Sequence, residues 1–140
     1  MALFDVFDIA GSAMSSQSVR LNVTASNLAN AQSVGGDEAT TYHARHPVFS
    51  AVMQSLRPGQ MPGQTTGVKV DGIVESQAPL EKSYQPGHPL ANEEGYVFMP
   101  NVNMVDEMSD MISASRSYQS NVEVLNTTKQ LMMATLRLGQ

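Results

Sequence analysis

The chain has 140 residues, with thirteen acidic and eight basic side chains and a formal net charge of −5. This length leaves room for about one domain. Charged residues make up 15% of the sequence, below the usual quarter, so uncharged side chains supply most of its polarity. The acidic balance argues against a nucleic-acid binder held by a basic patch. The sequence has no cysteine, which excludes disulfides, thiolate metal sites and cysteine nucleophiles.

Prolines divide the sequence into three parts. All seven lie between Pro47 and Pro100, and proline is excluded from helix interiors because it removes a donor and clashes with the preceding turn. The sequence therefore predicts an α+β fold. We expect an N-terminal helix at 1–34, a small β-rich, Pro/Gly-rich middle module at 35–100 with an exposed loop near 57–67, and a C-terminal helix at 101–140 that pairs with the first helix as a coiled-coil-like hairpin.

The N-terminal segment carries large apolar residues at intervals of seven: Phe7, Met14, Leu21 and Leu28. The serines, asparagines and glycine around them cost a free helix about 4–5 kcal/mol relative to alanine. Full burial of the four apolar side chains contributes about 6–12 kcal/mol, but only if something covers them. We therefore expect this helix to need a partner. The segment has no basic residue before Arg20 and no continuous apolar run, so we expect no cleaved signal peptide.

The middle module reads as short strands and turns. Residues 42–53 are typical of a strand with a bulge or edge position at Pro47. Residues 68–70 and 73–75 flank the dipeptide Asp71-Gly72, which predicts a two-residue hairpin turn. Residues 96–99 form a further strand candidate.

The C-terminal segment is the clearer helix. Mostly apolar residues recur in steps of four and three, which is typical of a coiled-coil seam: Met104, Met108, Met111, Ser115, Tyr118, Val122, Leu125, Lys129, Met132 and Leu136. Asn101 or Asn103 supplies a start signal and Gly139 a stop signal. We expect the seam to face the first helix of the same subunit.

A second stripe on this segment consists of serines at 109, 113, 117 and 120. Small uncharged polar faces allow close packing on more than one side. The stripe therefore indicates contacts with neighbouring helices, and a solvated helix of low charge is the simpler alternative.

Sites for catalysis or metals are weakly supported. The histidines His43, His46 and His88 could be imagined around zinc, but His43 and His46 would point to opposite faces of a strand. The pair Glu93-Glu94 is better explained as a solvated turn than as an acid–base pair. No phosphate loop or serine elbow is present. We expect no enzyme, no cofactor and no metal.

Two stretches carry a family resemblance. Residues 21–30 (LNVTASNLAN) resemble the signature of flagellar rod and hook proteins, whose first helix ends in an Asn-(Ile/Leu)-Ala-Asn sequence. The second stretch includes PGHP at 86–89, GYV at 95–97, PNVN at 100–103 and MISASRSYQSN at 111–121. It resembles the FlgC group of basal-body rod proteins within that family. Residues 31–41 depart from the family's usual link, which leaves the contacts of that link open.

The resemblance implies a structural subunit of the proximal rod in the periplasm, exported unfolded through the flagellar type III apparatus. Its terminal helices would form an inner tube around the export channel and transmit torque. The implied partners are other flagellar rod subunits, copies of itself, and inner-membrane ring and export-gate components. No nucleic acid and no small-molecule substrate is implied. On the resemblance alone, Asn27 and Asn30 are helix-end and inter-subunit hydrogen-bond residues.

We expect helices of such low propensity to order only when neighbours cover their stripes. The predicted helix-packing and assembly residues are, besides Asn27 and Asn30, Phe7, Met14, Leu21 and Leu28 in the first helix and Met108, Met111, Tyr118, Val122, Leu125, Met132 and Leu136 in the second. The alternatives are another flagellar rod subunit, a cytosolic helical adaptor or export chaperone, and last an enzyme of the middle module. An adaptor would have Glu/Lys-rich outer faces and helices that are stable alone.

Overall fold

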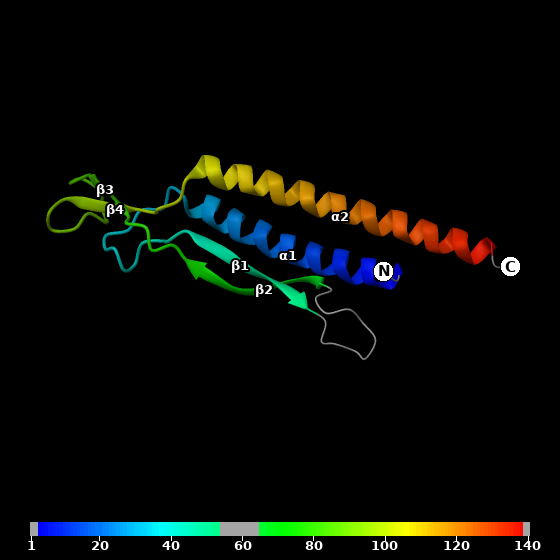
Figure 1. Ribbon diagram of the computed structural model, residues 1–140. Coiled ribbons are helices and arrows are strands. Elements are labelled where there is room, and N and C mark those ends of the chain that lie inside the picture. Colours follow the sequence, from blue (N-terminus) through cyan, green and yellow to red (C-terminus); the bar gives the residue numbers. More distant parts are fainter. Residues whose placement is uncertain (1–2, 54–64, 139–140) are drawn as a thin grey trace.

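The computed structural model describes residues 3–53 and 65–138. Two long helices lie side by side and run in opposite directions, α1 (Leu3–Asn30) and α2 (Met104–Leu138). Between them in the sequence come four strands: β1 (Arg45–Met53), β2 (Thr65–Glu75), β3 (Glu81–Tyr84) and β4 (Tyr96–Met99). The strands β1 and β2 lie along α1, and β3 and β4 form a second sheet at one end of the molecule (Figure 1). The predicted α+β fold with a hairpin of terminal helices is confirmed.

The start of α2 is fixed by an asparagine cap. The Oδ1 atom of Asn103 accepts bonds from the backbone N–H groups of Val105 (3.0 Å) and Asp106 (3.4 Å). Such a side chain satisfies donors that the first helical turn leaves open. Of the two asparagines expected to start this helix, Asn103 is therefore the cap. The predicted stop at Gly139 lies outside the described residues, as does most of the predicted loop, from 57 to 64.

The predicted hairpin turn at Asp71-Gly72 is wrong. The strand β2 runs straight through this dipeptide and pairs along its length with β1, and Asp71 is the extra residue of a β-bulge opposite Val48 and Phe49. A type I′ turn needs positive φ at both central residues, whereas Gly95 is the glycine with positive φ in the described ranges. The bulge leaves Asp71 2.8 Å from Lys69, whose ammonium lowers the pKa of that carboxyl.

The end of the molecule that carries β3 and β4 we call the head, residues 31–44 and 76–103. Its sheet is the best-covered part of the chain, because Val97 is fully buried and Phe98 nearly so. The backbone of Phe98 also bonds in both directions with Gly35, which ties the link after α1 to β4. The predicted strand at 96–99 is confirmed, and it anchors the head.

The core is small for a chain of this size. Four of the eight buried hydrophobic residues in the described ranges are alanines, namely Ala10, Ala31, Ala44 and Ala114. The accessible surface is 9659 Å², whereas a compact monomer of this mass exposes about 7,100 Å². Many large apolar side chains on α2 and the β1–β2 pair are more than a third exposed. The single chain therefore leaves much apolar surface without cover.

Candidate functional site

Asn27 is the centre of a buried polar junction near the end of α1. Its side chain is fully buried and uses all four of its hydrogen-bonding positions. The Nδ2 group donates to Arg45 O (2.8 Å) and to Glu107 Oε1 (2.8 Å), and Oδ1 accepts from Arg45 N (2.9 Å) and the Tyr42 hydroxyl (2.8 Å). One side chain thus joins α1, the link into β1, and the first turns of α2. We call these four residues the junction.

Glu107 is the unusual member of the junction, since it is an acid only 5% exposed. Its Oε1 atom accepts from Asn27, while its buried Oε2 atom has no hydrogen-bond partner among the described residues. Buried carboxylates depend on such bonds, because each lost bond leaves a desolvated charge. The position of Glu107 therefore depends directly on Asn27.

A second polar link lies within the head, at the segment that leads into α2. The Oδ1 atom of Asn101 accepts from Ala44 N (2.7 Å) and its Nδ2 group donates to Ala78 O (2.7 Å). The residues before α2 are thereby fixed to the residue before β1.

The two helices contact each other through small and polar side chains. Of the described helices and strands, α1 alone packs against α2. The most buried α2 positions are Glu107, Ala114 and Thr128, which are separated by seven and by fourteen residues, and Thr24 of α1 is also buried. The hydroxyls of Thr24 and Thr128 bond to carbonyls of their own helices, so they cost little inside the interface.

One ion pair crosses the helix interface. The guanidinium of Arg20 donates to Asp110 Oδ1 at 2.6 Å, and the two side chains are 28% and 48% exposed. Because both remain in contact with water, the pair orients the helices more than it stabilises them.

The predicted seams lie at the rim of this interface. Half-buried positions are Phe7, Met14, Leu21 and Leu28 on α1, and Met111, Val122, Leu125 and Met132 on α2. Three predicted residues are more exposed: Met108 (50%), Tyr118 (38%) and Leu136 (66%). The expectation that the seam faces the partner helix does not hold for these three. Ala114 and Thr128 are buried at the centre of the interface instead, where their small side chains let the helices approach closely.

Both apolar stripes border the same side of the helix pair. On α1, Ser16 donates to Val68 O of β2 (3.4 Å) and Ser12 accepts from Val68 N (3.2 Å). Helical periodicity places Met14 and Leu21 on the opposite side of α1 from these serines. Because the two helices are antiparallel, the side of α2 that carries Met111 lies next to the side of α1 that carries Met14 and Leu21. The two stripes form one face, which we call the apolar face.

Asn30 closes the end of α1, since its Nδ2 group donates to Ser26 O (2.8 Å). The histidines lie in separate polar contacts: His43 Nδ1 is 3.3 Å from Ser76 O, and His88 Nδ1 accepts from Leu90 N. Within residues 3–53 and 65–138, no three histidine, cysteine, aspartate or glutamate side chains gather as a metal site. The helices of those ranges are also not apolar enough over a sufficient length to cross a membrane.

Sequence reasoning found Asn27 but missed its partners. Glu107 is an acid in the first turns of α2, where the helix dipole favours acids, and Tyr42 and Arg45 lie in the segment predicted as a strand, so none of the three was predicted as a partner of Asn27. The sequence does not single out Glu107, because Asp106 and Asp110 are acids in the same turns of the helix.

Comparisons with known proteins agree with this arrangement. Residues 7–35 match the family described as "Flagella basal body rod protein", and residues 93–138 match "Flagellar basal body rod FlgEFG protein C-terminal". The chain is 56% identical to the flagellar basal-body rod protein FlgC of Salmonella typhimurium and, equally, to that of Escherichia coli O157:H7, over the full length of each. It is 44% identical to the FlgC of Buchnera aphidicola subsp. Schizaphis graminum, again over all of both chains. With such similarity from end to end, the chain belongs to the FlgC family of flagellar basal-body rod proteins.

Proposed function

We propose that this chain, a structural subunit of the flagellar basal-body rod, polymerises in the proximal rod through its terminal helices. In that position the helices surround the export channel and carry torque. Its partners there are other rod subunits and copies of itself, with ring and export-gate components at the base. Membership of a family of rod proteins supports this structural role over the adaptor and enzyme alternatives.

The apolar face is the observation that carries this proposal. Large side chains of both helices lie on one side of the hairpin and are only half covered by the chain itself. Covering them with helices of neighbouring subunits contributes about 25 cal/mol for each Å² of apolar surface buried. The stripes at Leu21 and Leu125 are therefore proposed as the polymerisation surface.

Torque transmission follows from how the head is held. A force on the head reaches α1 and α2 through the junction, because Asn27 and Glu107 bond across both helices. The ion pair of Arg20 with Asp110 adds a second cross-link two helical turns away from Asn27. Each subunit then moves as one body, and the many helix contacts between subunits share the load.

The chain's composition suits export as an unfolded polypeptide to the periplasm. It contains no cysteine that could form a disulfide on the way. Its helices contain many serines and asparagines, which lower intrinsic helix propensity. Ordering of the full helix length would then be favoured where neighbours cover the apolar face.

The test is a rod-assembly assay in a motile bacterium whose own copy of the gene is deleted. The variants Leu21→Glu and Leu125→Glu place a charge on the apolar face, while Asn22→Glu and Thr127→Glu place the same charge on exposed neighbouring positions. We expect the first pair to abolish swimming and the presence of the chain in purified basal bodies. The second pair should retain both. Intact rods containing Leu21→Glu or Leu125→Glu would refute the proposed polymerisation surface.

A further inference from the structure

Methionine supplies all of the sulfur in this chain. The sequence holds ten methionines and no cysteine, so a peroxide that meets the chain oxidises sulfur at methionine alone. The peroxide must reach the sulfur atom, and exposure therefore decides which methionine reacts first. In the described residues, Met108 and Met133 are each 50% exposed and Met104 is 37% exposed. Met14 and Met111 are half-buried. The exposed methionines of the described ranges thus all lie on α2.

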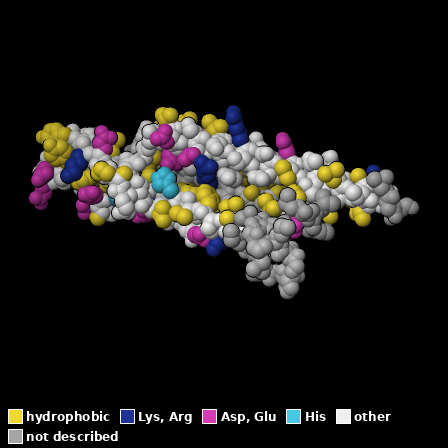
Figure 2. All heavy atoms as spheres, viewed as in Figure 1, with side chains coloured by type: hydrophobic (Ala, Val, Ile, Leu, Met, Phe, Trp, Pro, Cys, Tyr) yellow, Lys and Arg dark blue, Asp and Glu magenta, His cyan; other side chains and the backbone are white. Residues whose placement is uncertain are grey.

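Met108 is the centre of an exposed apolar patch. On a helix surface, the neighbours of a residue lie three and four positions away in each direction. For Met108 these are Met104, Val105, Met111 and Ile112. All four are apolar, and Val105 and Ile112 are 70% and 53% exposed. Figure 2 shows hydrophobic side chains at the surface over the first turns of α2. We call these five residues the methionine patch, and none of their side chains carries a hydrogen-bond donor.

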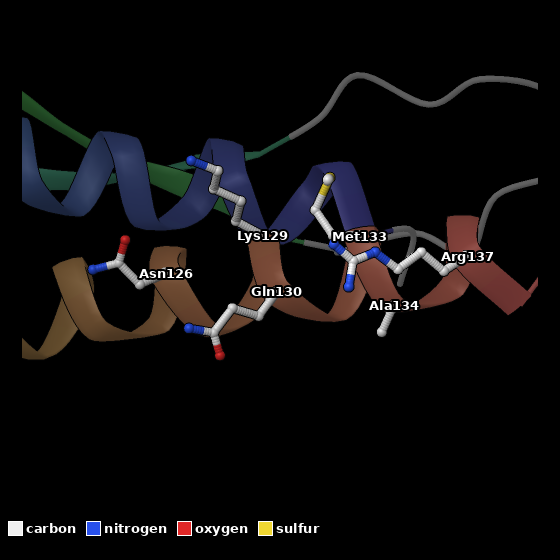
Figure 3. Close-up of a pocket in the computed structure, with 6 residues that line it drawn as sticks. All are labelled: Asn126, Lys129, Gln130, Met133, Ala134 and Arg137. Carbon is white, nitrogen blue, oxygen red and sulfur yellow. The ribbon is translucent and has the colours of Figure 1, made fainter.

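Met133 is equally exposed, but its neighbours differ. The residues at the same spacings are Lys129, Gln130, Leu136 and Arg137, and three of these side chains can donate hydrogen bonds. Figure 3 shows Met133 with Lys129 and Arg137 beside it, around a shallow depression on α2. The two methionines therefore have the same access to solvent and opposite surroundings.

We propose that Met108 is a site of oxidation by peroxides in the chain before assembly, and that its sulfoxide keeps the chain out of the rod. This inference rests on the proposed function, because it supposes that neighbouring subunits cover α2. In the reaction, the sulfur lone pair attacks one oxygen of hydrogen peroxide, so that an S–O bond forms and the O–O bond breaks. The sulfur loses two electrons, and the peroxide is reduced to water.

The sulfoxide changes what the methionine patch can bury. It adds an S=O group, whose oxygen is polar and accepts hydrogen bonds. When a neighbouring subunit covers the patch, this oxygen finds no donor within it. An unpaired polar group then weakens the contact about tenfold or more. At Met133 the same oxygen can accept from Lys129, Gln130 or Arg137. Oxidation at Met108 therefore opposes assembly, whereas oxidation at Met133 is tolerated.

Assembly and oxidation compete for the same side chain. Peroxide reaches the sulfur of Met108 while the methionine patch is exposed, and neighbours cover the patch while that sulfur is reduced. Two events that exclude each other at one site are coupled in both directions. A subunit already in the rod is consequently protected from oxidation at Met108, and a chain oxidised there beforehand is left out.

The first experiment locates the oxidation. The purified full-length chain is treated with hydrogen peroxide, and mass spectrometry measures the sulfoxide at each methionine. We expect Met108 and Met133 to react at similar rates, about fivefold or more faster than the half-buried Met14 and Met111. In purified basal bodies, Met108 should react about tenfold or more slowly than in the free chain. The proposal is overturned if Met108 reacts no faster than Met111, or reacts equally fast in basal bodies and in the free chain.

The second experiment introduces the polarity of the sulfoxide by mutation. Glutamine is polar and of similar length, so Met108→Gln should lower the amount of chain in purified basal bodies about tenfold. Met133→Gln, the matched change at an equally exposed position, should leave this amount near the wild-type level. Met108→Leu keeps the side chain apolar and should recover the incorporation that Met108→Gln loses. Circular dichroism of each purified variant verifies that its helices form.

Two results of this second experiment would overturn the role of Met108: wild-type incorporation of Met108→Gln, or equal losses for Met108→Gln and Met133→Gln. Neither result would refute the proposed function, which is scored separately by Leu21→Glu and Leu125→Glu. Loss of incorporation for those two variants, together with normal incorporation of Met108→Gln, would retain the rod assignment and reject an oxidation-sensitive site at Met108.

Discussion

At the scale of single residues, Asn27 determines how the chain's parts meet. An asparagine offers two donor and two acceptor positions, and the fully buried side chain of Asn27 uses all four on three different segments. Aspartate lacks the two donor positions, and leucine, which is of similar size, lacks both the donors and the acceptors. This position therefore accepts no close substitute among the other side chains.

The first prediction concerns this side chain. Asn27→Ala removes the partners of Glu107 Oε1 and of the Arg45 backbone, and leaves both in a desolvated site. We expect the free energy of unfolding to fall by about 3 kcal/mol, since buried polar groups without partners each cost about 1–3 kcal/mol. The measurement is the midpoint of urea unfolding followed by circular dichroism.

Asn22→Ala is the matched control for this change, because Asn22 is exposed on the same helix. Its effect should stay within about 0.5 kcal/mol. Equal unfolding midpoints for Asn27→Ala and Asn22→Ala would show that the junction does not stabilise the chain.

The ion pair between Arg20 and Asp110 provides the second residue-scale prediction. With 28% and 48% of the side chains exposed, water screens the pair, and we expect a coupling energy of about 0.5 kcal/mol that falls with added salt. A double-mutant cycle of Arg20→Ala and Asp110→Ala measures it. A coupling several times larger that does not respond to salt would mean that the pair behaves as a buried one.

At the scale of elements, the β1–β2 pair shows how a local signal is overruled. Asp71-Gly72 is a strong turn signal, but each of its flanks offered only three residues to pair. The alternative partner, β1, has nine residues, so pairing with β1 satisfies far more backbone groups. The dipeptide is then accommodated in the strand, with Asp71 as the extra residue of a β-bulge. A turn motif alone does not show which distant strand is available.

The third prediction tests the packing of β2 on α1. A Cβ atom at Gly67 would lie 2.5 Å from Ser12 Oγ, which itself bonds to Ile9 O and accepts from Val68 N. Gly67→Ala must displace that hydroxyl, and we expect it to lower the free energy of unfolding by about 1 kcal/mol. Gly72→Ala, in the same strand with open space around its Cβ, should be neutral or slightly stabilising. The measurement is thermal unfolding of both variants. Equal melting temperatures would refute the close approach of Gly67 to Ser12.

The helices were predictable from the sequence because their apolar periodicity extends over many turns, and no proline interrupts it. The sequence did not show which face of each helix turns toward the other helix. The apolar stripes suggested a conventional seam, yet Ala114 and Thr128 occupy the centre of the interface and Met108 lies at its rim. Periodicity locates a stripe, but in a subunit that has neighbours the largest apolar residues need not face the partner within the chain.

At the scale of the whole molecule, side-chain burial is distributed unevenly along the long axis. The head end has the buried β4 strand, the junction and the asparagine cap of α2. Toward the other end, the last buried α2 position is Thr128, and beyond it Leu131, Met133 and Leu136 are exposed. The expectation from sequence that the helices order only on assembly therefore applies best to the end of α2, where few side chains are buried. We expect order near the junction in the isolated chain, and order over 129–138 only where neighbours cover the exposed side chains.

The last prediction is a gradient of hydrogen exchange along α2 in the isolated chain. Local opening is easiest where few side chains are buried and no second helix lies alongside. We expect peptides covering 132–138 to exchange at least about a hundredfold faster than peptides covering 104–114, because a difference of about 3 kcal/mol in opening free energy gives that ratio. Mass spectrometry at about 1 µM chain, where association is weak, measures both in one sample. Equally slow exchange along α2 would mean that the helix is fully formed before assembly, and equally fast exchange would mean that even the junction needs neighbours. Only the gradient fits a subunit whose head end is preformed and whose C-terminal helix end becomes ordered when neighbouring subunits cover it.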